Sequence, residues 1–200
     1  DKFFFTTNLN DSVSSSNGSA ASGSWRHVCG TWDGTDGTAG LNIYVNGVVD
    51  NDSSSAGAGT EDDSTYDIGI GHDDYSSTRF NGDLDDIRLY NRELSAADVA
   101  ALYNAGLAAT NGGTGVTGGG GGAPSSGLVS HWLLDETSGA SIADAVGSNT
   151  GTWTDGVNND VAEETIAGNI GTAIGFDASN DEIRVSNDPS LENFTAMTLS

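Results

Sequence analysis

The residue best placed to do chemistry in this sequence is Asp85, within the stretch 83–90 (DLDDIRLY). The pattern predicts a strand, in which alternate side chains share a face, so Asp85 points the same way as Ile87 and Leu89. We expect the Ile87 and Leu89 face to be the core side, which turns Asp85 inward at the start of the strand. A buried carboxylate is costly unless it is paired or bound to a metal. The position therefore predicts a metal ligand, a partner of Arg88 or a cap on backbone amides.

The other candidate catalytic groups do not form a recognisable reactive arrangement. The sequence holds no G-x-S-x-G and no H-E-x-x-H pattern. The acidic strings at 61–63 and 83–86 do not form a catalytic pair, and we expect His27, His72 and His131 to have structural roles. We therefore predict that the chain is not an enzyme.

Charge and composition exclude several partners. The 200 residues contain 6 Lys+Arg against 29 Asp+Glu, a net charge of −23, so nucleic-acid binding is excluded because phosphate contacts need basic side chains. No apolar stretch approaches the roughly 18 residues that span a bilayer, so we predict no membrane insertion. The acidity fits solubility in a salty medium, and it also fits binding of divalent cations. The single cysteine, Cys29, fits a buried core thiol.

The elements around Asp85 are short strands followed by one helix. Residues 1–7, 25–32, 41–45 and 66–71 predict strands, and Asn46-Gly47 predicts a type I′ hairpin turn. Alternation in 25–32 does not show which face is buried. Ser95 and Asp98 predict the start of a helix through a near capping box, and Val99, Leu102 and Tyr103 give that helix an apolar side.

After the helix the composition changes to a Gly-rich stretch and then returns to strands. Residues 107–126 predict a flexible linker, most strongly from Asn111 onward. Residues 171–185 predict two strands with inward pairs Ile174/Phe176 and Ile183/Val185, and 194–200 predicts another.

Several motifs resemble those of one family. The stretch 80–95 (FNGDLDDIRLYNRELS) resembles the closing segment of laminin-G-like jelly-roll domains, in the concanavalin A-like lectin and glucanase superfamily. The stretches 25–34 and 41–50 resemble its WxHVAxTYDG and LxLYVDG motifs, and the segment from 127 resembles its opening. The resemblance implies an all-β, antiparallel jelly-roll β-sandwich with one short C-terminal helix per domain.

The order of these motifs implies an unusual domain organisation. Residues 1–106 resemble the C-terminal part of such a domain, 107–126 a Gly-rich linker, and 127–200 the N-terminal part of the next. A piece of a tandem array is the simplest interpretation. A permuted sandwich whose two segments fold on each other, or a filament whose subunits complete one another, would also satisfy the pattern, because half a sandwich cannot close its own core.

The resemblance also implies a metal. Members of this family often hold one structural Ca²⁺ where the first and last strands meet, and the matching positions here are Asp85, Asp135 and Asp144. The paired glutamates of the glucanases, E-x-D-x-E, are absent.

The expected function is a structural or adhesive repeat of an extracellular surface protein or filament, stabilised by calcium. Its partners would be copies of itself or neighbouring repeats, and possibly glycans. The alternative is a carbohydrate-binding module attached to a secreted enzyme, with Tyr75 and Trp153 as candidate sugar contacts and Asn-x-Ser/Thr sequons at Asn10, Asn17, Asn51 and Asn193.

Overall fold

The computed structural model describes residues 1–6, 11–57, 67–73, 78–110, 123–157 and 159–200. These residues form antiparallel strand pairs and one α-helix, which confirms the predicted all-β class with a short helix. The chain divides into two compact units. Unit 1 comprises Asp1–Asp63, Arg88–Leu128 and Asn193–Ser200, and unit 2 comprises Ser64–Ile87 and Val129–Glu192. Each unit therefore contains residues from both sides of the Gly-rich stretch.

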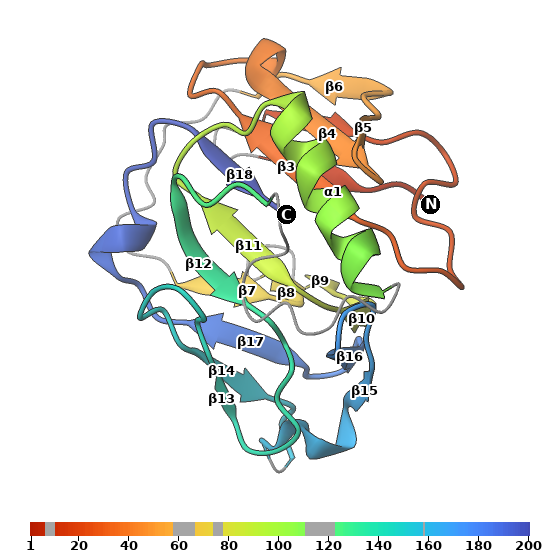
Figure 1. Ribbon diagram of the computed structural model, residues 1–200, viewed down its shortest axis with the longest axis vertical. Coiled ribbons are helices and arrows are strands. Elements are labelled where there is room, and N and C mark those ends of the chain that lie inside the picture. The colour runs from red at the N-terminus through yellow and green to blue at the C-terminus, as the bar shows by residue number, and fades with distance from the viewer. Residues whose placement is uncertain (7–10, 58–66, 74–77, 111–122, 158) are drawn as a thin grey trace. The chain divides into compact units, whose positions relative to one another are not determined.

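The main sheet of unit 1 has a strand from the end of the sequence at its centre. Within unit 1 its strands follow the order β11-β18-β3-β4-β5, and Figure 1 shows β18 between β11 and β3. The strands are β3 (Val28–Trp32), β4 (Leu41–Val45), β5 (Val48–Val49), β11 (Ile87–Tyr90) and β18 (Met197–Leu199). Asn46 and Gly47 join β4 to β5 with φ of 52° and 78°, which confirms the predicted type I′ turn.

Both faces of this sheet are covered, so β3 is buried on both faces. On one side lies the small sheet β1-β2-β6, made of β1 (Phe4–Thr6), β2 (Ser12–Ser14) and β6 (Ser53–Ser55). The core on that side contains Val13, Trp32, Leu41 and Ile43. Helix α1 (Ala96–Thr110) covers the other side (Figure 1). The core beneath it contains Cys29, Tyr44, Tyr90, Leu94, Val99 and Leu102.

Helix α1 starts as expected and ends later than expected. The Ser95 hydroxyl accepts a hydrogen bond from the Asp98 N–H, and the Asp98 carboxylate accepts one from the Ser95 N–H, both at 3.2 Å, which is the reciprocal geometry of a capping box. The helix continues to Thr110, so the first four residues of the predicted 107–126 linker are helical. Alanine has the highest helix propensity, and Ala108 and Ala109 lie in this extension.

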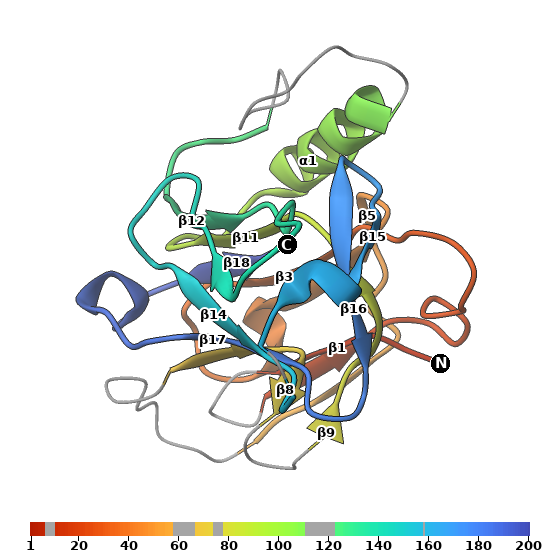
Figure 2. The ribbon, with the colours of Figure 1, turned by 90° about the horizontal axis from the view of Figure 1, so that it is seen from below.

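Most of the remaining strands form two main sheets in unit 2. One sheet has the order β13-β14-β17-β7 and the other β10-β16-β15, and β8 pairs with β9. Figure 2 shows β14 beside β17 and β15 beside β16. The rings of Trp153 and Phe176 pack edge to face at 5.2 Å in its core. The strands are β7 (Ile68–Ile70), β8 (His72–Asp73), β9 (Thr78–Arg79), β10 (Asn81–Leu84), β12 (Leu128–Trp132), β13 (Ser141–Ile142), β14 (Gly151–Thr154), β15 (Thr165–Ala167), β16 (Thr172–Asp177) and β17 (Glu182–Val185). Short 3₁₀ turns occur at Thr38–Gly40, Val161–Glu163 and Pro189–Leu191.

The predicted single strand over 83–90 is wrong in one respect. β10 ends at Leu84 and β11 begins at Ile87, so Asp85 and Asp86 lie between two strands. Asp86 has φ of 60°, a left-handed conformation that a continuous strand cannot contain. The alternation of faces does not continue across this break. The neighbours Leu89 and Tyr90 are both buried, so β11 does not have one buried and one exposed face there.

Candidate metal site

Asp85 lies at the break between β10 and β11 and faces the turn that joins β15 to β16. Its Oδ2 accepts a hydrogen bond from the Ile170 N–H at 2.8 Å, and the Asn169 N–H also donates to the carboxylate. Its Oδ1 is buried and has no hydrogen-bond partner among the described residues. The amide-capping interpretation of Asp85 thus accounts for only one of its two oxygens.

The environment of Asp85 disfavours its charge. Burial raises the pKa of Asp85 to about 7, against the opposing effect of the two backbone N–H donors. The negative charges of Asp86 and Asp135 add to the rise. Near neutral pH the carboxyl group is therefore poised between its neutral and charged forms, which a nearby cation would shift to the charged form.

Asp135 faces the same turn. Its Oδ1 accepts hydrogen bonds from the Thr172 N–H at 2.7 Å and the Thr172 hydroxyl at 3.2 Å. Gly171, with φ of 72°, allows this close approach, because a Cβ there would lie 2.3 Å from the same Asp135 oxygen. The two predicted ligands Asp85 and Asp135 are therefore brought to the two sides of one turn.

Asp144 is held in a different role. Its carboxylate accepts backbone hydrogen bonds from His131 at 3.0 Å, Val146 at 3.1 Å and Asn149 at 3.1 Å, and also from Gly147. Burial pushes the pKa of Asp144 up, but these four donors together hold it below its usual range. The Asp144 carboxylate therefore stabilises its own loop through backbone hydrogen bonds. Among the described residues, no contact joins Asp144 to the turn between β15 and β16.

A histidine near the site was not singled out as a site residue by sequence reasoning. His131 is 2% exposed, and its Nε2 hydrogen-bonds the Asp86 Oδ1. The same residue donates its backbone N–H to Asp144, so it links Asp144 to the residue beside Asp85. The only sequence signal was its place beside Trp132 in a predicted strand, and that pattern does not reveal the chain fold that brings Asp86 to it.

The donor set fits a cation that prefers oxygen ligands, although it is incomplete in side chains. The described residues contain no group of three or more His, Cys, Asp or Glu side chains that could hold a metal. Calcium takes six to eight oxygens and accepts backbone carbonyls. Asp85 and Asp135 offer two carboxylates beside a half-buried turn, and the Asp85 Oδ1, which has no hydrogen-bond partner among the described residues, could bind a cation there. A Ca²⁺ ion would need carbonyls of the turn and water to complete its shell.

The candidate sugar contacts have different outcomes. Trp153 is fully buried in unit 2, so its prediction as a sugar contact is wrong. Tyr75 and the sequon at Asn10 lie outside the described residues. Asn17, Asn51 and Asn193 are exposed. Among the described residues, no helix is long and apolar enough to cross a membrane.

Comparison with known proteins identifies the family. The family model described as "Concanavalin A-like lectin/glucanases superfamily", a laminin-G model, matches residues 1–100. No curated protein and no solved structure gives a match. Together with the antiparallel sheets, the match shows that this chain belongs to the laminin-G-like family of the concanavalin A-like lectin/glucanase superfamily.

Proposed function

We propose that this chain is a structural or adhesive module of an extracellular surface protein or filament, and that Ca²⁺ stabilises it. Its family supports a carbohydrate-binding or adhesive module in general, because laminin-G-like domains are typically non-catalytic and commonly extracellular. The repeat, the calcium and the location outside the cell are the parts that we add.

One observation carries the calcium part of the proposal: the buried Asp85 Oδ1 has no hydrogen-bond partner in the part of the chain that the structure describes. An uncompensated carboxylate in a partly buried site costs free energy, and the raised pKa of Asp85 reflects that cost. A cation bound there would offset the cost and would also relieve the repulsion from Asp135.

The position of the two acids suggests what the ion does. Asp85 comes from the segment before the Gly-rich stretch, whereas Asp135 and the turn at 168–171 come from the segment after it, and all lie in unit 2. An ion held by Asp85, Asp135 and turn carbonyls would join the two segments of that unit. Calcium would then act as a cross-link, which suits a protein under mechanical or proteolytic stress.

Thermal unfolding with and without Ca²⁺ tests this role. At pH 8 we expect millimolar Ca²⁺ to stabilise the wild-type chain by about 2–3 kcal/mol, the value for a ligand near 100-fold above its Kd. Mg²⁺ should stabilise the chain less, because it requires a rigid octahedral shell. Asp85→Asn should lose most of the calcium response.

Asp83→Asn is the matched control, because Asp83 is exposed and only two residues away. It removes the same charge and should retain the full calcium response. Equal responses of Asp83→Asn and Asp85→Asn would assign any calcium effect to general charge screening and would contradict the proposed site.

A carbohydrate-binding role remains the alternative, and one observation favours it. Phe80 is 39% exposed and packs edge to face on Phe176 at 6.1 Å, so it is a fixed aromatic ring at the surface of unit 2. Aromatic rings of this kind pack against sugar faces, and the adjacent Asn81 is also exposed. Selective binding on a glycan array in millimolar Ca²⁺, lost in Phe80→Ala, would support this role over a purely structural one.

A further inference from the structure

Unit 1 holds a strand-shaped slot at the centre of its main sheet, between β3 and β11. The occupant is β18, which pairs with Leu89 and Tyr90 on one side and with residues 30–32 on the other. Both neighbours direct backbone N–H and C=O groups into the slot. Without residues 193–200 these groups would form two open strand edges inside a sheet, which proteins avoid.

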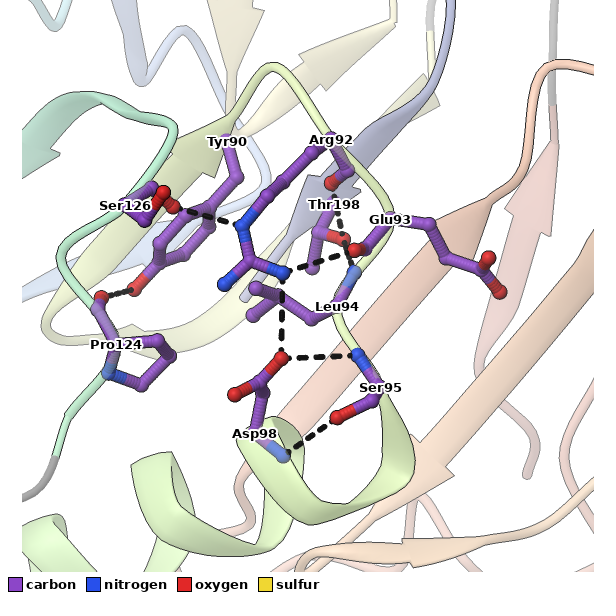
Figure 3. Close-up of polar contacts among 9 residues, drawn as sticks. All are labelled: Tyr90, Arg92, Glu93, Leu94, Ser95, Asp98, Pro124, Ser126 and Thr198. Atoms are coloured by element: carbon purple, nitrogen blue, oxygen red, sulfur yellow. Dashed lines mark hydrogen bonds and ion pairs between the residues drawn. The ribbon is translucent and has the colours of Figure 1, made fainter.

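The slot recognises its occupant through side chains as well as backbone. Thr198 is fully buried, and its hydroxyl accepts a hydrogen bond from the Leu94 N–H and donates one to the Arg92 carbonyl, each at 2.9 Å. Figure 3 shows Thr198 between these two groups. At the strand end, the Ser200 hydroxyl lies 2.9 Å from the His27 Nε2. These contacts select a hydroxyl-bearing strand with a defined register.

Arg92 and Tyr90 also hold the other incoming segment. The Tyr90 hydroxyl donates to the Pro124 carbonyl at 3.0 Å, and the Arg92 Nε donates to the Ser126 carbonyl at 2.8 Å (Figure 3). The stretch 90–98 is therefore a docking surface for two segments of chain that follow the Gly-rich sequence.

We propose that this slot binds residues 193–200 of a second copy of the chain, so that copies assemble by exchange of β18. The contacts of an exchanged strand are the same as those of the chain's own strand, so the choice depends on the hinge and on concentration. The hinge is the non-strand segment 192–196, where Asn193 is exposed and has φ of 55°. The inference rests on the proposed function, because only a dense array brings copies to the roughly millimolar level that competes with a tethered strand.

Cysteine trapping tests the exchange directly. Arg88 and Ser200 exchange two backbone hydrogen bonds at 2.7 and 2.9 Å, so the adjacent cross-strand pair Leu89 and Leu199 is a non-hydrogen-bonded pair with closely spaced side chains. Such spacing suits a disulfide. The native Cys29 does not compete, because it lies beneath the helix and burial raises the pKa of its thiol to about 12.

The experiment uses two full chains, one with Leu89→Cys and a size-tagged one with Leu199→Cys. They are unfolded, mixed and refolded together at rising concentrations, and the products are then mildly oxidised. We expect a mixed disulfide whose yield rises at least 5-fold as the total concentration approaches 1 mM. The matched control replaces Leu89→Cys with Val48→Cys on the exposed β5, which should give only a low, collision-limited yield.

Two results would overturn the proposal. One is a mixed disulfide that is no more abundant than in the Val48→Cys control at any concentration, although a single chain that carries both Leu89→Cys and Leu199→Cys forms its internal disulfide. The other is a wild-type chain that refolds only to 20.3 kDa monomers by light scattering up to millimolar concentration, a readout that needs no variant. Either result leaves the calcium and glycan tests intact, so failure of exchange is distinguishable from failure of the proposed function.

Discussion

At the scale of single residues, Asp85 couples the proposed metal site to pH. In the unfolded chain a carboxyl of this type loses its proton near about pH 4, whereas the folded pKa is about 7. The group therefore contributes its full stabilisation below about pH 4, and this is lost as the pH rises through 7. Calcium would reverse that loss because it favours the charged form.

Without metal, Asp85→Asn should be more stable than the wild type above pH 7 and should lose this advantage below pH 4. We expect a difference of about 1–2 kcal/mol at pH 8, reduced from the full shift because the group is partly exposed to solvent. Urea unfolding in a chelating buffer from pH 4 to pH 8 measures it. A difference that is independent of pH would show that folding does not raise the pKa of Asp85.

Thr198 is a second single residue for which we predict a large effect on the free energy of unfolding. Thr198→Val keeps the shape but leaves the buried Leu94 N–H and Arg92 carbonyl without their partner. We expect a loss of about 2 kcal/mol in the free energy of unfolding. Thr198→Ser, which keeps the hydroxyl, should recover most of it. No loss in Thr198→Val together with a loss in Thr198→Ser would mean that the methyl group, and not the hydrogen bonds, holds β18.

At the scale of elements, the start of helix α1 depends on a short polar network. Ser95 and Asp98 cap each other, and the Asp98 carboxylate also accepts a hydrogen bond from the Arg92 Nη1 at 3.2 Å (Figure 3). Because this helix covers the core that contains Tyr90 and Leu94, its first turn positions the docking surface formed by residues 90–98.

Ser95→Ala should destabilise the chain by about 1 kcal/mol, the usual cost of an N-cap. Ser95→Asp is the matched replacement that can still cap the helix, although it adds a charge beside Asp98. Denaturant unfolding followed by circular dichroism measures both variants. If Ser95→Ala unfolds at the same midpoint as the wild type, the packing of Val99 and Leu102 alone determines the helix.

The sequence predicted elements with local causes and missed features that depend on distant chain. The hairpin at Asn46-Gly47 and the helix start at Ser95 follow from nearby residues, and both are present in the structure. The break at Asp85 and Asp86 was missed because alternation alone favoured a continuous strand. The Asp86–His131 contact joins residues 45 apart, and no local pattern encodes such a pairing.

The predicted metal ligands show the same division. The strand pattern and the family resemblance both indicate Asp85, the resemblance alone indicates Asp135, and the structure places both beside the 168–171 turn. Asp144 matched the motif equally well, yet four backbone N–H groups occupy its carboxylate. Its backbone partners could not be foreseen, because they depend on how the 144–149 loop folds.

At the scale of the whole molecule, strands before the Gly-rich sequence pair with strands after it in both units. In unit 1, β18 lies between β11 and β3. In unit 2, β17 pairs with β7 and β16 pairs with β10. These pairs form within one chain, and the choice among the three arrangements open to the sequence stays a prediction. The domain boundaries at 106 and 127 stay predictions.

Cleavage within the Gly-rich stretch tests this interleaving most directly. A specific protease site placed between residues 116 and 117 would divide the chain into two fragments without touching a described strand. After cleavage in calcium-containing buffer, we expect both fragments to elute together at the size of the intact 20.3 kDa chain and to unfold in one transition. Fragments that separate in native buffer and retain their β structure would show that each segment stands alone, and would contradict the interleaved fold.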